Sequence, residues 1–177
     1  MKRQRPPSLI DGWLSSRARL LERHEVRVAA PTERAYDTIA QVRLSDLPVV
    51  RALLTLRRIS YSKGMTLRQF FGTSPFLILE EDPPHEVVFG VAVGWRPPAF
   101  PTPEDFRRYE REGAIRAVGN FQIEAIESGS LISTETWIET FGARARWRFR
   151  AYWLIVGPFS AFIRREFLRA AQNRAQG

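Results

Sequence analysis

Residues 144–167, RARWRFRAYWLIVGPFSAFIRREF, constrain the fold most, because two hydrophobic periods meet in one run. From Arg144 to Arg150 every second residue is arginine, which is the alternation of a half-exposed strand. After Tyr152 the apolar residues recur three and four positions apart, as in a helix. If residues 144–150 were a strand, the preceding strand would provide only two acidic residues, Glu135 and Glu139, to pair with its row of arginines. We therefore favour a helix throughout and keep the strand as the alternative. Its expected apolar stripe is Trp147, Tyr152 or Ala151, Leu154 and Ile155.

The same helix carries a Gly157–Pro158 pair in its middle. Pro158 has no N–H to donate to the carbonyl of Leu154, so the helix should kink there. Beyond this point Phe159, Phe162, Ile163 and Phe167 share one side. A long, kinked, aromatic-rich helix of this kind is suited to closing an antiparallel sheet.

The rest of the chain predicts an α+β fold. We expect a strand from His24 that stops at Pro31, a helix after Pro31, and a second short helix from Ser45 with Val50, Leu53, Leu54 and Leu56 inward. Residues 57–74 are mixed, with Gly64 and Gly72 as breaks, and we expect an irregular strand within them. Phe76–Glu80 and Glu86–Trp95 form a hairpin around Asp82, Pro83 and Pro84. A proline-rich flap or crossover with a charged helical fragment follows, and then two strands, at 114–126 and 131–141.

The length of 177 residues predicts one domain over residues 24–177, preceded by an N-terminal appendage, residues 1–23, with a short helix capped by Ser8. The chain has no cysteine and only His24 and His85, so we expect no metal site. The opening is interrupted by Asp11 and two serines, which argues against a signal peptide. The longest apolar run is too short and too interrupted to cross a bilayer, so we expect a cytoplasmic protein without a transmembrane segment.

The net charge of +8 is concentrated at the ends of the chain. Residues 1–27 carry a net charge of +4, residues 144–177 carry +7, and the middle carries −3. Nearly all of the 27 basic residues are arginine, which is more typical of a GC-rich genome than of a selected binding face. Charge alone therefore argues against a nucleic-acid-binding protein.

Three motifs resemble the START-like, helix-grip (SRPBCC) superfamily of polyketide cyclase-like and lipid-transfer-like proteins. HEVRVAAPTERAYDTIAQV, residues 24–42, looks like its first strand and helix, and TETWIE, residues 134–139, resembles its threonine-rich last strand. The run from Tyr152 to Ala175 is similar to the closing helix of a bacterial subgroup without an assigned activity. The resemblance covers residues 24–176. It implies a curved antiparallel sheet around the C-terminal helix, with a cavity for an apolar or amphipathic small molecule, and it transfers no catalytic motif.

Alternate residues on the concave face of such a sheet would line the cavity. The expected ligand-binding residues are Phe89, Trp95, Tyr109, Phe121, Trp137, Glu139, Trp153 and Phe159. Ordinary core packing explains the aromatic members equally well. The other polar candidates, Arg116, Asn120 and Glu135, are also explained as exposed strand residues. Neither histidine has a serine or carboxylate pattern that marks nucleophilic catalysis, and no nucleotide fingerprint occurs, so we expect no cofactor.

Three functions follow from these observations. The leading one is binding of a lipid, polyketide or aromatic molecule, with residues 97–103 as a gate. The alternative is a cyclase or dehydratase on the same scaffold, with acid-base help from Glu139, Tyr109 or an arginine. The third is a nucleic-acid or acidic-partner module that uses the terminal arginines. A homodimer is compatible with all three.

Overall fold

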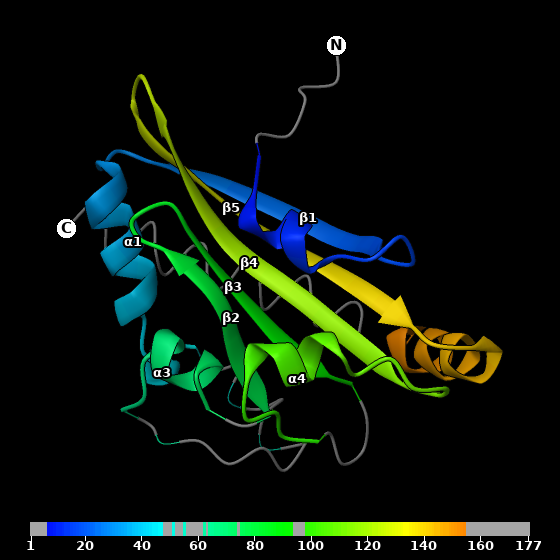
Figure 1. The fold of residues 1–177 in the computed structure, drawn as a ribbon. Coiled ribbons are helices and arrows are strands. Elements are labelled where there is room, and N and C mark those ends of the chain that lie inside the picture. The colour runs from blue at the N-terminus through cyan, green and yellow to red at the C-terminus, as the bar shows by residue number, and fades with distance from the viewer. Residues whose placement is uncertain are drawn as a thin grey trace.

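The computed structural model describes residues 7–47, 51, 55, 62, 64–73, 75–93 and 98–154. Its centre is one five-stranded sheet in the order β1-β5-β4-β3-β2, with every neighbouring pair antiparallel (Figure 1). The strands are β1 (Arg19–Val28), β2 (Phe76–Asp82), β3 (Glu86–Ala92), β4 (Ile115–Ile126) and β5 (Gly129–Thr140). The α+β class, the hairpin β2–β3 and the last two strands are confirmed.

Strand alternation gives this sheet two differently covered faces. On the front face, Phe121 of β4 and Val87 of β3 pair across the strands and lie under α1 (Thr32–Gln41) and α3 (Leu67–Phe71). On the back face, Val118 pairs with Trp137 and packs under the 3-10 helix η1 (Leu9–Trp13) and α4 (Pro103–Arg107). Below, front face means the face covered by α1 and α3, and back face means the face covered by η1 and α4, whatever the direction of view in a figure.

The helices on the front face begin where the local sequence provides their N-termini. Pro31 precedes α1, and the helix buries Ala35, Thr38 and Ile39 against the sheet. A capping box at Thr66 starts α3: the Thr66 hydroxyl accepts from the backbone N–H of Gln69, and the Gln69 side chain accepts from the N–H of Thr66. The expectation of an irregular strand over 57–74 is therefore wrong for 67–71, which are helical. A short 3-10 helix, η2 (Leu44–Asp46), lies between α1 and α3.

Residues 143–154 are helical, so the strand alternative for 144–150 is excluded. The apolar stripe was predicted on the wrong side of this helix. Ala145 and Phe149 are buried, and Tyr152 and Trp153 continue the same side onto Ile115 and Ile138 of the front face. Trp147 and Leu154, which we expected to be buried, are 71% and 82% exposed. The kink at Gly157–Pro158 and everything after residue 154 lie outside the described residues.

The N-terminal segment differs from the expected short helix. Within the described residues 7–18 only Leu9–Trp13 is helical, as a 3-10 turn whose N–H groups donate no capping hydrogen bond to the Ser8 side chain. The first strand begins at Arg19 and not at His24, so residues 19–23, which we assigned to the appendage, form the first half of β1. Ile10 and Trp13 pack with Leu79, Val88 and Phe106 on the back face.

Two glycines let aromatic rings lie directly on the sheet. A Cβ on Gly119 would meet the ring of Phe89 at 2.8 Å on the front face. A Cβ on Gly90 would meet the ring of Phe106 at 2.7 Å on the back face. Because Gly119 and Gly90 have no side chain, the rings of Phe89 and Phe106 lie close to the sheet and are only 5% and 1% exposed.

No helix within the described residues is long and apolar enough to span a membrane. Of the predicted second helix, Arg51 and Thr55 are described and are helical, whereas its apolar residues Val50, Leu53, Leu54 and Leu56 fall outside the described residues. Two expected ligand-binding residues, Trp95 and Phe159, fall outside them as well.

Candidate ligand pocket on the front face

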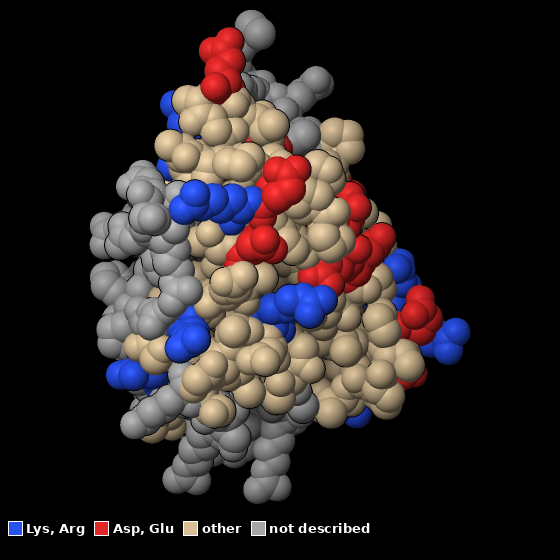
Figure 2. All heavy atoms as spheres, turned by 90° about the vertical axis from the view of Figure 1, so that its left-hand side faces the viewer, with Lys and Arg blue, Asp and Glu red and all other residues tan. Residues whose placement is uncertain are grey.

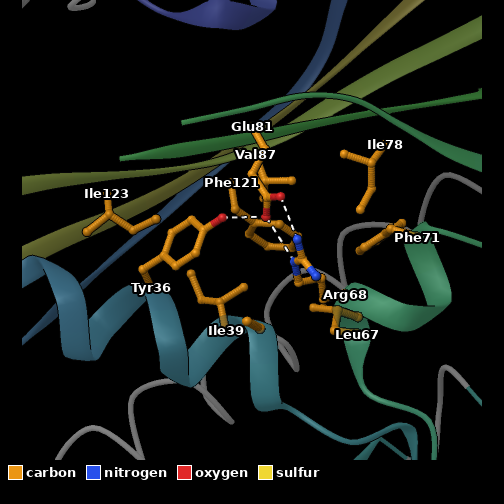
Figure 3. A pocket seen from close by; sticks show the side chains of 11 residues that line it. Tyr36, Ile39, Leu67, Arg68, Phe71, Ile78, Glu81, Val87, Phe121 and Ile123 are labelled. Atoms are coloured by element: carbon orange, nitrogen blue, oxygen red, sulfur yellow. Dashed lines mark hydrogen bonds and ion pairs between the residues drawn. The ribbon is translucent and has the colours of Figure 1, made fainter. Parts of the chain in front are cut away.

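A narrow pocket opens between the front face of the sheet and the helices α1 and α3 (Figure 3). Its walls are mostly apolar, and three polar side chains, Tyr36, Arg68 and Glu81, lie together in it. The other lining residues are Ile39, Ala40, Leu67, Phe71, Ile78, Val87, Phe121 and Ile123.

The three polar side chains of the pocket form one hydrogen-bonded group, which we call the Tyr-Glu-Arg group. Tyr36 donates from its hydroxyl to Oε1 of Glu81 at 2.5 Å. Arg68 donates from Nε to Oε1 at 3.0 Å and from Nη2 to Oε2 at 2.7 Å, which is a two-point grip on the carboxylate. The group joins α1, α3 and β2, so it also ties both helices to the sheet.

Hydrogen bonding fixes the protonation state of this group. The hydrogen bonds from Arg68 lower the pKa of the Glu81 carboxyl below its ordinary value, although partial burial acts in the opposite direction. Burial raises the pKa of the Tyr36 phenol far above its ordinary value, and the hydrogen bond to Glu81 raises it further. The carboxylate is therefore charged and the phenol neutral at neutral pH.

This arrangement is suited to an amphipathic molecule. The apolar walls offer no hydrogen-bonding groups to a ligand, so an aliphatic or aromatic body fits there. The Arg68 side chain is 55% exposed, so its guanidinium can reach an acceptor on an entering molecule. A guanidinium group that binds Glu81 through two hydrogen bonds is also suited to binding the carboxylate of a ligand.

The pocket is almost closed in this structure. Its cavity volume is about 20 Å³, room for about one water molecule. Phe71 fills the bottom by stacking on Phe89, with ring centroids 3.9 Å apart. Occupancy by anything larger than water therefore requires side chains such as Phe71 to move.

Two of the expected ligand-binding residues lie at or beside this pocket. Phe121 lines it, and Phe89 lies beneath Phe71 in the same aromatic cluster, with Phe89 and Phe121 ring centroids 5.9 Å apart. Trp153 is on the same face of the sheet but stacks on Phe149 at 5.7 Å and does not line the pocket. Whether any of them contacts a ligand stays a prediction.

Trp137 and Glu139 lie on the back face, away from this pocket. Glu139 is completely buried, and it accepts from the guanidinium of Arg116 and from the backbone N–H of Ser15. The indole of Trp137 donates to Oε2 of Glu135 at 2.8 Å. Both side chains belong to the layer that holds η1 and the segment after it on the sheet.

The other polar candidates belong to the same back-face layer or to its edge. Asn120 donates to Oε1 of Glu86 at 2.6 Å and accepts from the N–H of Glu135 at 2.9 Å. Tyr109 follows α4 and contacts the ring of Phe100, with centroids 5.2 Å apart. Phe100 itself packs in the back-face cluster, so the described part of the proline-rich segment does not support a gate over the front-face pocket.

Sequence reasoning missed all three members of the Tyr-Glu-Arg group. Tyr36 lies among the apolar positions of its helix and Glu81 lies at the end of a hairpin, so neither position in the sequence indicates a binding residue. Arg68 lay in the mixed segment for which we expected a strand. The capping box at Thr66 was the available signal, since it would have placed Arg68 in the first turn of a helix.

The described residues contain no group of three or more His, Asp or Glu side chains that could hold a metal ion.

A second, more open groove of about 580 Å³ lies where η1 meets the end of the β2–β3 hairpin, and Asp82, Glu86 and Glu124 give it an acidic lining. Figure 2 shows the side of the molecule that carries α1, where acidic and basic side chains are interspersed over the described surface.

No protein-family model matches this chain, and no curated protein matches it. Among solved structures, a protein from Mesorhizobium loti is similar with 12% identity and a TM-score of 0.45, over 89% of this chain and 97% of that one. CalU16 from Micromonospora echinospora has 14% identity and a TM-score of 0.32, over 87% and 81%. An aromatase/cyclase, ZhuI, from a Streptomyces species has 14% identity and a TM-score of 0.36, over 90% and 94%. With TM-scores below 0.5 these are partial similarities, and the fold described above rests on the strand register and contacts of this chain alone.

Proposed function

We propose that this protein binds an apolar or amphipathic small molecule between the front face of its sheet and the helices that cover it. The proposal includes the helix-grip arrangement, in which the C-terminal helix completes the enclosure. The observation that carries it is the convergence of eight apolar side chains and the Tyr-Glu-Arg group on one pocket. Ligand pockets typically combine apolar walls with a small number of placed polar groups, and this pocket has both.

The ligand class follows from the Tyr-Glu-Arg group. A molecule with a carboxylate or carbonyl at one end can accept from the N–H groups of Arg68 that Glu81 does not use, while its body lies along Ile39 and Phe121. The Arg68–Glu81 pair is partly exposed, so an entering carboxylate can share the guanidinium without leaving a charge buried and unpaired. Medium-chain carboxylic acids and aromatic acids meet both requirements.

Binding has to be coupled to opening of the pocket, because the closed cavity holds about one water. Phe71 is the side chain best placed to move, since it stacks on Phe89 and lies in the short helix α3 next to Arg68. A ligand that replaces this stacking contact with its own apolar body would hold the pocket open.

Thermal stabilisation by decanoic acid and by 1-decanol tests the proposal. We expect decanoic acid to raise the melting temperature of the wild-type protein and the Arg68→Ala variant to lose this response. Arg34→Ala is the matched control, because Arg34 is an exposed arginine of α1 that does not line the pocket. Ala40→Phe should abolish the response to both compounds by filling the pocket. Stabilisation that survives in Ala40→Phe, or its absence in the wild-type protein, would contradict the proposal.

A cyclase or dehydratase on the same scaffold is the second candidate, and the Tyr36–Glu81 contact is the observation in its favour. The phenol and the carboxylate are the acid and base that such chemistry would use. Against it, both carboxylate oxygens of Glu81 already accept hydrogen bonds, and the raised pKa of Tyr36 makes the phenol a weak proton donor. Turnover of a polyketide-like substrate that is lost in Glu81→Gln, with binding retained, would establish the enzyme instead.

A further inference from the structure

The outer side of helix 143–154 carries two of the three exposed large hydrophobic side chains of the described residues. Trp147 and Leu154 are 71% and 82% exposed, and only one other large hydrophobic side chain of the described residues, Leu20, is exposed. Trp147, Ala151 and Leu154 are spaced four and three residues apart, so they form one stripe along the helix. The opposite side of the helix, with Ala145 and Phe149, is buried on the sheet, so the orientation of this stripe is fixed.

Arginines flank the stripe on both sides. At about 100° per residue, Arg144 and Arg148 fall on one side of the Trp147–Leu154 line, and Arg150 and Arg146 fall on the other. All four are exposed, and none forms an ion pair with a described residue. Residues 143–154 contain no acidic side chain that would neutralise them. The surface is therefore an apolar line between two cationic rows.

We propose that this face of helix 143–154 docks the protein on an anionic lipid surface. Tryptophan and leucine enter the boundary between headgroups and acyl chains, and arginines beside them pair with lipid phosphates and carboxylates. The helix lies flat on the protein, so it presents the whole stripe to a plane at once. The proposed attachment is peripheral, with the helix lying along the membrane surface.

A nucleic acid fits this surface less well than a lipid does. Phosphates of a duplex would pair with the arginines, but Trp147 and Leu154 would then be trapped between charged groups with no apolar partner. A lipid surface gives every group of the stripe a favourable environment. The inference does not depend on the proposed function, since it uses none of the pocket residues.

Cosedimentation with vesicles tests this proposal. We expect the wild-type protein to sediment with vesicles of phosphatidylcholine and phosphatidylserine and not with vesicles of phosphatidylcholine alone. Replacing the apolar stripe (Trp147→Ser with Leu154→Ser) or two of the arginines (Arg148→Gln with Arg150→Gln) should each lower the partition coefficient by about tenfold or more. These side chains are exposed, so circular dichroism and the melting temperature should not change.

Two matched controls separate this face from exposure and charge in general. Leu20→Ser removes an exposed apolar side chain elsewhere, and Arg34→Gln with Arg108→Gln removes two other exposed arginines, and both should bind as the wild type does. Quenching of Trp147 fluorescence by brominated lipids, absent in Trp147→Phe, should place the indole in the membrane. The proposal is overturned if anionic vesicles do not retain the wild-type protein, if both stripe and arginine variants still bind, or if duplex DNA is bound instead with no dependence on Trp147.

Discussion

The hydroxyl of Tyr36 in α1 donates a 2.5 Å hydrogen bond to the carboxylate of Glu81 in β2, and Arg68 of α3 grips the same carboxylate from the other side. Three elements separated in sequence thus meet at one carboxylate beside an apolar pocket. This contact both fastens the helices to the sheet and provides the polar end of the proposed ligand site.

Stability should depend on pH through Glu81. Its pKa is lower in the folded state than in the unfolded chain, because Arg68 donates to the carboxylate. A lowered pKa contributes stability that is complete above the unfolded value of about 4.3 and is lost as the pH falls through the folded value. We expect the free energy of unfolding of the wild type to exceed that of Glu81→Gln at neutral pH and the difference to shrink in acid. Urea unfolding at a series of pH values measures this, and a constant difference would contradict it.

The contact between Phe89 and Gly119 should be sensitive to a single methyl group. Gly119→Ala places a Cβ 2.8 Å from the ring of Phe89, and that ring is held by stacking on Phe71. We expect a loss of about 1–3 kcal/mol in the free energy of unfolding. Gly12→Ala is the control, because nothing lies within 4 Å of a Cβ built there. Equal effects of the two substitutions in urea unfolding would show that the front core is loosely packed.

The buried ion pair on the back face should be costly to break from one side. Arg116 is 3% exposed and donates to Glu139 and to the backbone carbonyl of Phe106. Arg116→Met leaves the completely buried carboxylate of Glu139 without its cation, so we expect a loss of about 3–5 kcal/mol. Adding Glu139→Leu should recover part of this loss, as a double-mutant cycle in chemical denaturation will measure. If the double variant is no more stable than Arg116→Met, the pair does not act as a unit.

Glu86 should control how firmly the N-terminal segment lies on the back face. Its carboxylate accepts from the Ser8 hydroxyl at 2.6 Å and from the Leu9 N–H at 2.8 Å. Glu86→Gln weakens both hydrogen bonds, so the peptide 7–15 should exchange its amide hydrogens faster, while the sheet exchanges as before. Glu104→Gln, an exposed carboxylate of α4, is the control. Unchanged exchange in Glu86→Gln would mean that apolar packing alone holds the segment.

Local patterns in the sequence predicted most of the elements but not the faces on which particular residues lie. Alternation correctly assigned β3, β4 and β5 as strands. It could not show that Phe121 and Trp137 point to opposite faces, because that depends on the register of the β4–β5 hairpin. In the structure Trp137 pairs with Val118, three residues from Phe121, and an odd separation along a strand reverses the face.

The helix at 143–154 shows a second limit of sequence reasoning. Arginine at every second position leaves the phase of a helix undetermined, since either Trp147 or Phe149 can be the buried aromatic. The choice of Phe149 depends on Ile115 and Ile138 of the sheet, which are distant in sequence. The covering of the back face by η1 is likewise decided by contacts such as Ser15 with Glu139, across 124 positions, which no local pattern contains.

Photo-crosslinking with a diazirine-bearing medium-chain fatty acid tests the central claim most directly, because it locates the ligand on the chain. The account predicts saturable labelling, competed by decanoic acid, of peptides from α1, α3 and β4 that contain Ile39, Leu67 and Ile123. Labelling should disappear in Ala40→Phe. Saturable labelling confined to back-face peptides around Trp13 and Phe106, or labelling that Ala40→Phe leaves intact, would contradict it.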